Sequence, residues 1–355
     1  MPKDITLSVD YHDRVCVIRW YDHSTQKDQV FAEVPTTKKD LNDVVDRARV
    51  DAGREGRVIW IQESTTGWAR VQELFGKRVD FRLANVVQMP LPPKGRRRKT
   101  DKVDTARMQR EHLNGTLPLA YQPPAKWRQL RRLVAFRERL VARRTSLRNW
   151  VNRYLAHETW FDRTGLWSPK GQRRLEKLLS RLPRTDKVIV EQKLAEMDRL
   201  EEQLKVALSE LLLAFEESVD ARRLETMRGI GWVSAISIVA RIGPVKRFRD
   251  AEALIAFAGL APGIRESDQT RRNGRIGGGG TDLHLRRYVI EATVWARHLP
   301  RYKKAYDRVT KRRGSKVGRL VVARMMLRSI YKILKAKVDF DPGAPAPAVA
   351  VASGC

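Results

Sequence analysis

The sequence Ile5-Thr-Leu-Ser-Val-Asp10 alternates apolar and polar residues, and Arg14-Val-Cys-Val-Ile-Arg-Trp20 alternates again after a short gap. Alternation with a period of two is typical of β-strands, so the two stretches predict a β-hairpin. Arg57-Val-Ile-Trp-Ile-Gln62 is almost continuously apolar, as expected of a buried strand. Residues 41–52, between the predicted hairpin and this buried strand, have apolar residues at helical spacing. This order predicts an α/β domain over residues 1–120.

A pair of acidic residues follows the proline-rich and basic stretch that ends this domain. Asp101 and Asp104 are three residues apart, and a helix that begins after Thr100 would present both from one face. Two nearby carboxylates repel by roughly 4 kcal/mol at 4 Å in a medium of dielectric constant 20, so a cation has to hold them together. That cation is either a divalent metal or a neighbouring basic side chain such as Lys102 or Arg107. On these residues alone, a solvated helix start explains the pattern as well.

Two further acids stand at strand ends, where an α/β sheet presents its ligand-binding edge. Asp10 closes the first strand and Glu63 follows the buried strand. Either one alone reads as a turn cap or a surface ion pair. Together with Asp101 and Asp104 they predict a site for two divalent cations of the kind that transfers phosphoryl groups. Oxygen ligands favour Mg²⁺ or Mn²⁺ over zinc.

The charge of the chain predicts a polyanionic partner. Its 355 residues carry a formal net charge of +30 and a pI near 10.7, for which nucleic acid is the best explanation. The two cysteines form neither a disulfide framework nor a metal knuckle. No apolar run approaches 18 residues and no signal peptide is evident, so we expect a cytoplasmic protein, associated with the nucleoid and with no membrane contact. The basic residues beside the acidic pair are expected to bind nucleic acid: Arg96, Arg97, Arg98, Lys99 and Lys102.

The middle of the chain, residues 125–220, reads as two long amphipathic helices. Apolar residues recur at helical spacing from Leu130 to Tyr154 and again from Val190 to Phe215. Such a pair predicts an antiparallel hairpin or coiled-coil arm. Intramolecular packing and dimerisation explain the apolar seams equally well.

Residues 221–337 predict a helical domain with a helix-hairpin-helix-like element. Gly229 and Gly231 lie between two helical stretches, where a glycine turn lets the backbone approach a phosphate; a structural corner is about as good an explanation. A loop is expected over 264–280, with Ser267 among arginines that can neutralise a phosphodiester: Arg265, Arg271, Arg272 and Arg275. A basic helical stretch follows over 297–337. Residues 338–355 are rich in proline and alanine and are expected to be disordered.

Several segments in this order resemble one protein family. LSVDYHDR, IQESTTGWA and KTDKVDTARM resemble the RuvC-like nuclease domain of the DEDD transposases, the IS one-ten family of insertion-sequence recombinases, which includes Piv-type DNA invertases. RGIGWVSA, RFRDAEALIAFAGLAP, RESDQTRRNGRI and LHLRRYVIEATVWA resemble the C-terminal transposase domain of that family. The implied fold is α/β plus α: an N-terminal RuvC/RNase H-like domain, a helical coiled-coil arm and a C-terminal helical transposase domain.

The resemblance implies a two-part active site. Asp10, Glu63, Asp101 and Asp104 would bind Mg²⁺, and Ser267 would attack a DNA strand to give a phosphoserine intermediate and strand exchange. No histidine lies near Ser267 in sequence, so a metal-bound hydroxide or a tetrad carboxylate would take its proton, which requires the two domains to meet. The family also implies donor and target DNA, an element-encoded bridge RNA, and a homo-oligomer, either a dimer or a tetramer.

Two departures from the family pattern bear on the serine. Asp268 stands where a glycine is usual, and Thr281-Asp282 replaces Gly-Asn. The departures affect the identity of the nucleophile and not the fold. Three alternatives stand beside transposition: a Piv-like invertase, a metal-dependent Holliday-junction resolvase in which water attacks, and a non-catalytic nucleic-acid-binding protein.

Overall fold

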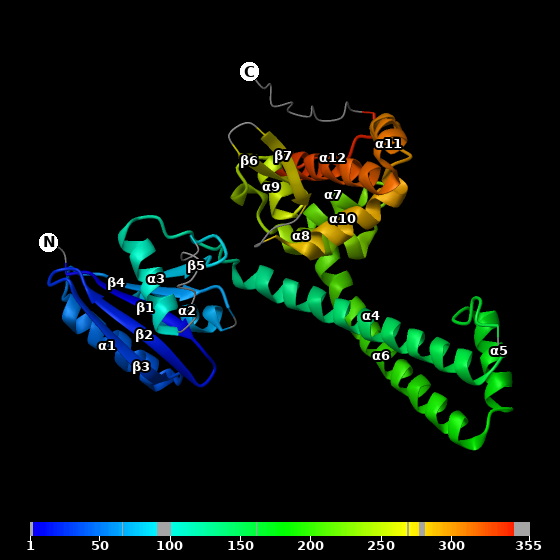
Figure 1. Cartoon of the computed structure of the whole chain (residues 1–355), viewed down its shortest axis with the longest axis horizontal. Helices are drawn as coiled ribbons and strands as arrows, with labels where there is room; N and C mark the ends of the chain where they lie inside the picture. The colour runs from blue at the N-terminus through cyan, green and yellow to red at the C-terminus, as the bar shows by residue number, and fades with distance from the viewer. Residues whose placement is uncertain are drawn as a thin grey trace. The chain divides into compact units, whose positions relative to one another are not determined.

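The computed structural model describes residues 3–65, 67–90, 101–160, 162–267, 270–276 and 281–343, with only the backbone described for 262–276 and for Ala32. The chain divides into two compact units, Met1–Gln122 and Pro123–Cys355. The first is a mixed α/β unit and the second is mainly helical (Figure 1). Among the described residues, no helix is both long and apolar enough to cross a membrane.

The first unit is built on a five-stranded sheet. Its strand order is β3-β2-β1-β4-β5; β1, β2 and β3 are antiparallel neighbours, whereas β4 and β5 run parallel to β1. The strands are β1 (Ile5–Tyr11), β2 (Val15–Asp22), β3 (Lys27–Pro35), β4 (Val58–Glu63) and β5 (Asp80–Ala84). The hairpin of β1 and β2 and the buried strand β4 were predicted and are confirmed; β3 was not predicted.

Helices cover both faces of this sheet. On one face lie α1 (Lys38–Ala52) and α2 (Trp68–Phe75), whose apolar residues pack with those of β1, β2 and β4; a short 3-10 turn (Gly76–Arg78) follows α2. The predicted helix over 41–52 is thus confirmed, with an added first turn capped by the Thr37 side chain. On the other face, Met108 of α3 (Asp101–Leu113) packs with Ile59 and Ile61 of β4.

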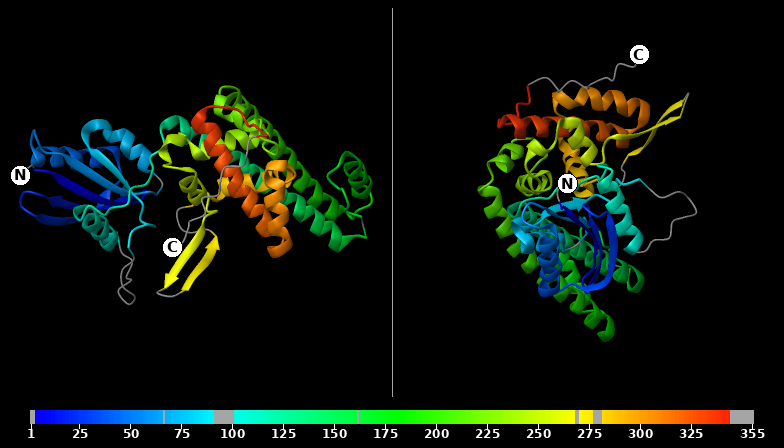
Figure 2. Two further views of the ribbon diagram at one scale, coloured as in Figure 1. Left: turned by 90° about the horizontal axis from the view of Figure 1, so that it is seen from above. Right: turned by 90° about the vertical axis from the view of Figure 1, so that its left-hand side faces the viewer.

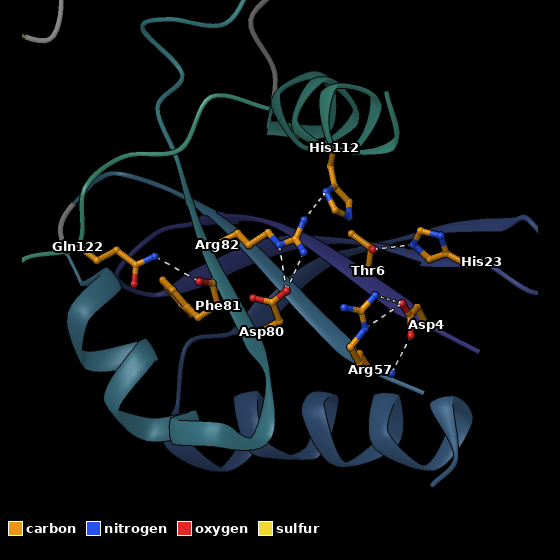
Figure 3. A network of polar contacts seen from close by, with 9 residues as sticks. All are labelled: Asp4, Thr6, His23, Arg57, Asp80, Phe81, Arg82, His112 and Gln122. Atoms are coloured by element: carbon orange, nitrogen blue, oxygen red, sulfur yellow. Dashed lines mark hydrogen bonds and ion pairs between the residues drawn. The ribbon is translucent and has the colours of Figure 1, made fainter. Parts of the chain in front are cut away.

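A polar network fixes the far end of α3 on the sheet (Figure 3). The Arg82 guanidinium of β5 donates to Nδ1 of His112 in the last turn of α3, at 3.1 Å, and also contacts Asp80 at 2.7 Å. His23 contacts the Thr6 hydroxyl at 2.9 Å, and its ring lies 6.4 Å from that of His112. Burial, and secondly Arg82, lower the pKa of His112 to about 4, so its imidazole is neutral at pH 7.

The second unit begins with a long helical pair, α4 (Ala125–Glu158) and α6 (Arg184–Glu216), joined through α5 (Pro169–Leu179). The two long helices lie side by side (Figure 1) and pack through Leu140 of α4 against Leu200 and Leu204 of α6. A second apolar cluster, which includes Leu155 and Leu175, joins α4 to α5. The predicted long helices are present with nearly the predicted bounds.

The remaining helices form one core with the inner ends of α4 and α6. They are α7 (Val219–Glu225), α8 (Trp232–Ile242), a 3-10 turn (Val245–Arg247), α9 (Ala251–Phe257), α10 (Leu283–Ala296), α11 (Pro300–Arg313) and α12 (Ser315–Ala336). The basic stretch 297–337 is therefore two helices, which separate at Gly314, where φ is +83°. α12 supplies much of the core, whereas only Tyr302 of α11 is buried.

The region expected to be a loop is partly a β-hairpin. β6 (Pro262–Ser267) and β7 (Thr270–Ile276) pair antiparallel, and the hairpin projects from its unit (Figure 2). The expectation of a loop was wrong for these residues. The segment has no alternating apolar residues to indicate strands, but strands can pair through backbone hydrogen bonds without them. The expectation of disorder was also wrong for residues 338–343, since the backbone amide of Phe340 donates to Thr226 Oγ1 and Arg301 donates to the Asp341 carbonyl. The rest of the tail, from 344, lies outside the described residues.

Candidate active site

Four carboxylates from separate parts of the sequence line one pocket of about 350 Å³ in the first unit. They belong to Asp10, Glu63, Asp101 and Asp104, the four residues that the sequence predicts as a metal-binding tetrad. Asp10 is buried, Glu63 and Asp104 are partly buried, and Asp101 is exposed. The pocket therefore holds carboxylates at several depths while it stays open to solvent.

Strand geometry explains how Asp10 and Glu63 meet. β1 and β4 are parallel, and their pairing Val9↔Gln62 places Asp10 and Glu63 at neighbouring positions. Because side chains alternate along a strand, Asp10 and Glu63 share the sheet face of Ile59 and Ile61, which is covered by α3. Both acids therefore lie on the sheet face that is covered by α3, the helix that carries Asp101 and Asp104.

Packing of α3 places Asp101 and Asp104 over the same edge. Met108 lies in the apolar layer between α3 and the sheet, and the Ser8 hydroxyl of β1 donates to Gln109 at 3.2 Å. Asp101 and Asp104 are in the first turn of this helix, on the side of the buried Thr105. The expected cap, Thr100, lies outside the described residues.

The electrostatics of the pocket favour a cation. Burial raises the pKa of Asp10 to about 6; His12 opposes the shift, whereas Asp101, Asp104 and Glu63 add to it. The His12 ring, 3.5 Å from Asp10, offsets the effect of burial on this pKa only in part. A divalent cation would offset the repulsion among these carboxylates.

The sequence analysis missed four residues that line this pocket, Tyr11, His12, Asp13 and Thr65, of which His12 and Asp13 matter most for its charge. His12 and Asp13 lie in the turn between β1 and β2 and line the same pocket as the tetrad. His12 Nε2 lies 3.5 Å from Asp10 Oδ1 and 3.6 Å from Asp101 Oδ2. The signal was the spacing: a residue two positions after Asp10, just beyond a strand end, can fold back over the edge that Asp10 occupies.

The donor set fits a divalent metal ion. Carboxylate oxygens are ligands for Mg²⁺ and Mn²⁺, and Asp10, His12 and Asp101 each offer one atom within 4.8 Å of the other two. The buried, charge-repelled Asp10 is the residue that gains most from such an ion.

The predicted nucleic-acid-binding residues fall in different places. Lys102 is exposed on α3, close in sequence to Asp101 and Asp104. Arg96, Arg97, Arg98 and Lys99 lie outside the described residues. Gly229 has φ of +98°, and an added Cβ would lie 2.5 Å from the Ala292 carbonyl oxygen, whereas Gly231 precedes α8 with open space beside it. Packing thus gives Gly229 a structural role that requires no phosphate.

Ser267 is the last residue of β6 and pairs with Thr270 of β7. Its backbone belongs to the second unit, and its side chain lies outside the described part, as do those of Arg265, Arg271, Arg272 and Arg275. Asp268 is not described. Asp282, the other departure from the family pattern, caps α10 by accepting from the Leu285 amide at 2.9 Å. An aspartate performs this role as well as the usual asparagine does.

Comparison with known proteins supports the family. A model described as Transposase (DEDD, IS110) matches residues 8–158, and the Transposase IS116/IS110/IS902 family model matches residues 221–307, about two thirds of the chain together. A protein of Sinorhizobium fredii (strain NBRC 101917 / NGR234) with the provisional name transposase y4qE is 23% identical over 211 residues, which are 59% of this chain and 51% of that protein. The chain thus spans about half the length of this curated relative. The pocket residues and the serine hairpin both fall within the matched segments, and the chain belongs to the IS110 family of DEDD transposases.

Proposed function

We propose that the protein is a DNA recombinase that moves an insertion sequence by cutting and rejoining DNA strands. The observation that carries the proposal is the convergence of Asp10, Glu63, Asp101 and Asp104 in one pocket of a chain that belongs to a transposase family. The sheet order of the first unit, with β1 to β3 antiparallel and β4 and β5 parallel to β1, supports an RuvC/RNase H-like domain.

The tetrad would hold Mg²⁺ or Mn²⁺. When bound, these ions neutralise the charge that develops on a phosphodiester during strand transfer. Asp10 and Glu63 supply their carboxylates from the rigid sheet, and Asp101 and Asp104 supply theirs from a helix that is packed on it. This support keeps four like charges at fixed positions, which a mobile loop would not do.

Ser267 would be the nucleophile. Its Oγ would bond to phosphorus while one bridging phosphorus–oxygen bond breaks. The serine proton would pass to a base, either a metal-bound hydroxide or a tetrad carboxylate, and the leaving oxygen would take up a proton and become the free hydroxyl of the cut strand. The backbone places Ser267 at the end of a strand pair, beside three arginines on β7 and one on β6. Guanidinium groups would neutralise the phosphodiester under attack.

The partners are part of the same proposal. Donor and target DNA, together with an element-encoded bridge RNA, would account for the net charge of +30. The helical arm of α4 and α6 offers a surface for a dimer or tetramer. With these partners, the protein would act in the cytoplasm in association with the nucleoid.

Covalent trapping tests the serine. The protein would be expressed with its native flanking DNA, so that any guide RNA is made, and then denatured with detergent. DNA attached to wild-type protein, and absent from Ser267→Ala, is the expected result. Sequencing of the attached ends would locate the cut sites and separate transposition from Piv-like inversion.

Three other outcomes would contradict parts of the proposal. Cleaved DNA without an adduct would indicate a junction resolvase in which water attacks, with Ser267 structural. Unchanged cleavage by Asp10→Ala would exclude the tetrad as the catalytic site, and binding without any cleavage would indicate a non-catalytic nucleic-acid-binding protein.

A further inference from the structure

His12 occupies a position that none of the sequence motifs explains. It is the first residue after β1, and the pairing of Tyr11 with Cys16 fixes both ends of its turn. Its ring nitrogen faces two acids that are far apart in sequence, Asp10 and Asp101. In the described part of the chain, these carboxylates are the only polar partners of the His12 side chain.

The distances suit a shared ion better than direct hydrogen bonds. His12 Nε2 lies 3.5 Å from Asp10 Oδ1 and 3.6 Å from Asp101 Oδ2, whereas a hydrogen bond to nitrogen is about 2.9 Å long. Ligands about 2.1 Å from one octahedral ion lie about 3.0 Å apart when adjacent and about 4.2 Å apart when opposite. The two measured separations fall between these values, so small side-chain movements would bring all three atoms onto one ion.

We propose that His12 is a nitrogen ligand of a divalent ion that Asp10 and Asp101 also bind, and that it makes the site prefer Mn²⁺, or another first-row transition ion, to Mg²⁺. Imidazole suits transition ions, whereas Mg²⁺ prefers oxygen ligands and keeps its waters. This inference rests on the proposed metal site and names a ligand that the four-acid motif does not contain.

The exposure of His12 makes it suitable for substitution. Its side chain is 55% exposed, and it lies in a turn outside the apolar core, so His12→Ala should leave the fold intact. His157, an exposed histidine at the end of α4 in the other unit, provides a matched control. Thermal unfolding in EDTA would verify that both variants fold like the wild type.

The test is pulsed EPR of Mn²⁺ bound to the full-length chain, with affinity measured in parallel. Wild type and His157→Ala should show ¹⁴N modulation from a directly bound imidazole, and His12→Ala should lack it. Loss of this ligand should weaken Mn²⁺ binding by roughly 10–100-fold, the range seen when groups that support metal ligands are removed. Mg²⁺ binding should change much less, so Mg²⁺ should displace Mn²⁺ more readily from the variant.

Other results would overturn the inference. Mn²⁺ binding without ¹⁴N modulation, and with equal affinity in His12→Ala, would show that His12 is not a ligand while leaving the carboxylate site in place. If Asp10→Asn binds Mn²⁺ as tightly as the wild type does, the ion binds elsewhere. The metal site of the proposed function would then fail as well.

Discussion

Asp10 carries an energetic cost in the metal-free protein. Its folded pKa of about 6 exceeds the ordinary value of 3.8, so between these values folded Asp10 binds a proton that the unfolded chain releases. Stability contributed by this group therefore falls as pH rises from about 4 to about 6. The shift corresponds to about 3 kcal/mol for a deeply buried group, and we expect about 1 kcal/mol after screening by solvent in the open pocket.

Asp10→Asn should thus stabilise the protein by about 1 kcal/mol at pH 7.5 in EDTA and by almost nothing at pH 4, while it abolishes strand cleavage. Denaturant unfolding at both pH values measures the difference. Asp13→Asn, which alters an exposed carboxylate of the same pocket, is the control. An Asp10→Asn variant that is less stable than wild type at pH 7.5 would show that the carboxylate is already neutralised by a partner.

His112 should produce the opposite slope. Its folded pKa of about 4 lies below the ordinary 6.5, because burial and Arg82 oppose its charge, and the pKa of His23 is lowered mainly by burial as well. The folded protein then binds fewer protons than the unfolded chain, so stability is lost as pH falls from about 6.5 towards 4. In His112→Asn the amide oxygen can still accept a hydrogen bond from Arg82. The free energy of unfolding of this variant, measured by denaturant titration, should therefore decrease much less than that of the wild type as pH falls from 6.5 to 4.

The two slopes overlap and partly cancel in the wild type. Compared with the wild type, stability of Asp10→Asn should therefore rise more steeply with pH between 4 and 6.5, and stability of His112→Asn should rise less steeply over the same window. Parallel curves for the two variants would contradict both assignments.

At the scale of elements, the two glycines in the turn between α7 and α8 allow a role in packing to be tested separately from a role in DNA binding. Gly229→Ala should destabilise the second unit by roughly 1–3 kcal/mol, because φ is +98° and the new Cβ would meet the Ala292 carbonyl. Gly231→Ala, with φ of −83° and open space, should cost less, roughly 0.5–1 kcal/mol, because alanine is a poorer N-cap than glycine. Thermal unfolding compares them, and loss of DNA affinity in Gly231→Ala alone would support the predicted phosphate contact.

Elements with an apolar face could be predicted from sequence, and those without one could not. β1 and the two long helices carry clear apolar periodicity, and β4 is a continuous apolar run. β3 is an edge strand, where charged residues and proline are tolerated. It contains Lys27, Asp28 and Glu33 and ends at Pro35, so its sequence lacks the apolar alternation that would predict a strand. The hairpin of β6 and β7 is almost wholly polar, and its pairing rests on backbone hydrogen bonds, which side-chain patterns do not report.

The site was partly predictable for a similar reason. Asp10 and Glu63 stand at the ends of strands that turn out to be parallel neighbours, so a general rule about sheet edges brought them together. His12 belongs to a turn, and the direction of a turn side chain depends on how the strands twist and pair. Sequence spacing alone does not supply that direction.

At the scale of the molecule, the division after Gln122 predicts that the first unit folds by itself. It has its own apolar clusters, and Gln122 donates to the Phe81 carbonyl inside it. A fragment of residues 1–122 should unfold cooperatively and retain Mn²⁺ binding within a few-fold of the full chain. Calorimetry and metal titration test this, with residues 123–355 as the comparison; binding by that fragment alone would place the ion elsewhere.

The acidic pocket has a consequence for timing. Five carboxylates, including that of Asp13, line a single pocket of a chain whose net charge is +30. The net positive charge would attract a nucleic-acid backbone, whereas the carboxylates of this pocket would repel it until cations bind. Two divalent ions would reduce the local charge from about −5 to about −1 and remove the barrier. If the proposed function holds, nucleic acid would bind first as an inert complex, and the supply of metal ions, rather than the encounter with DNA, would start the cut.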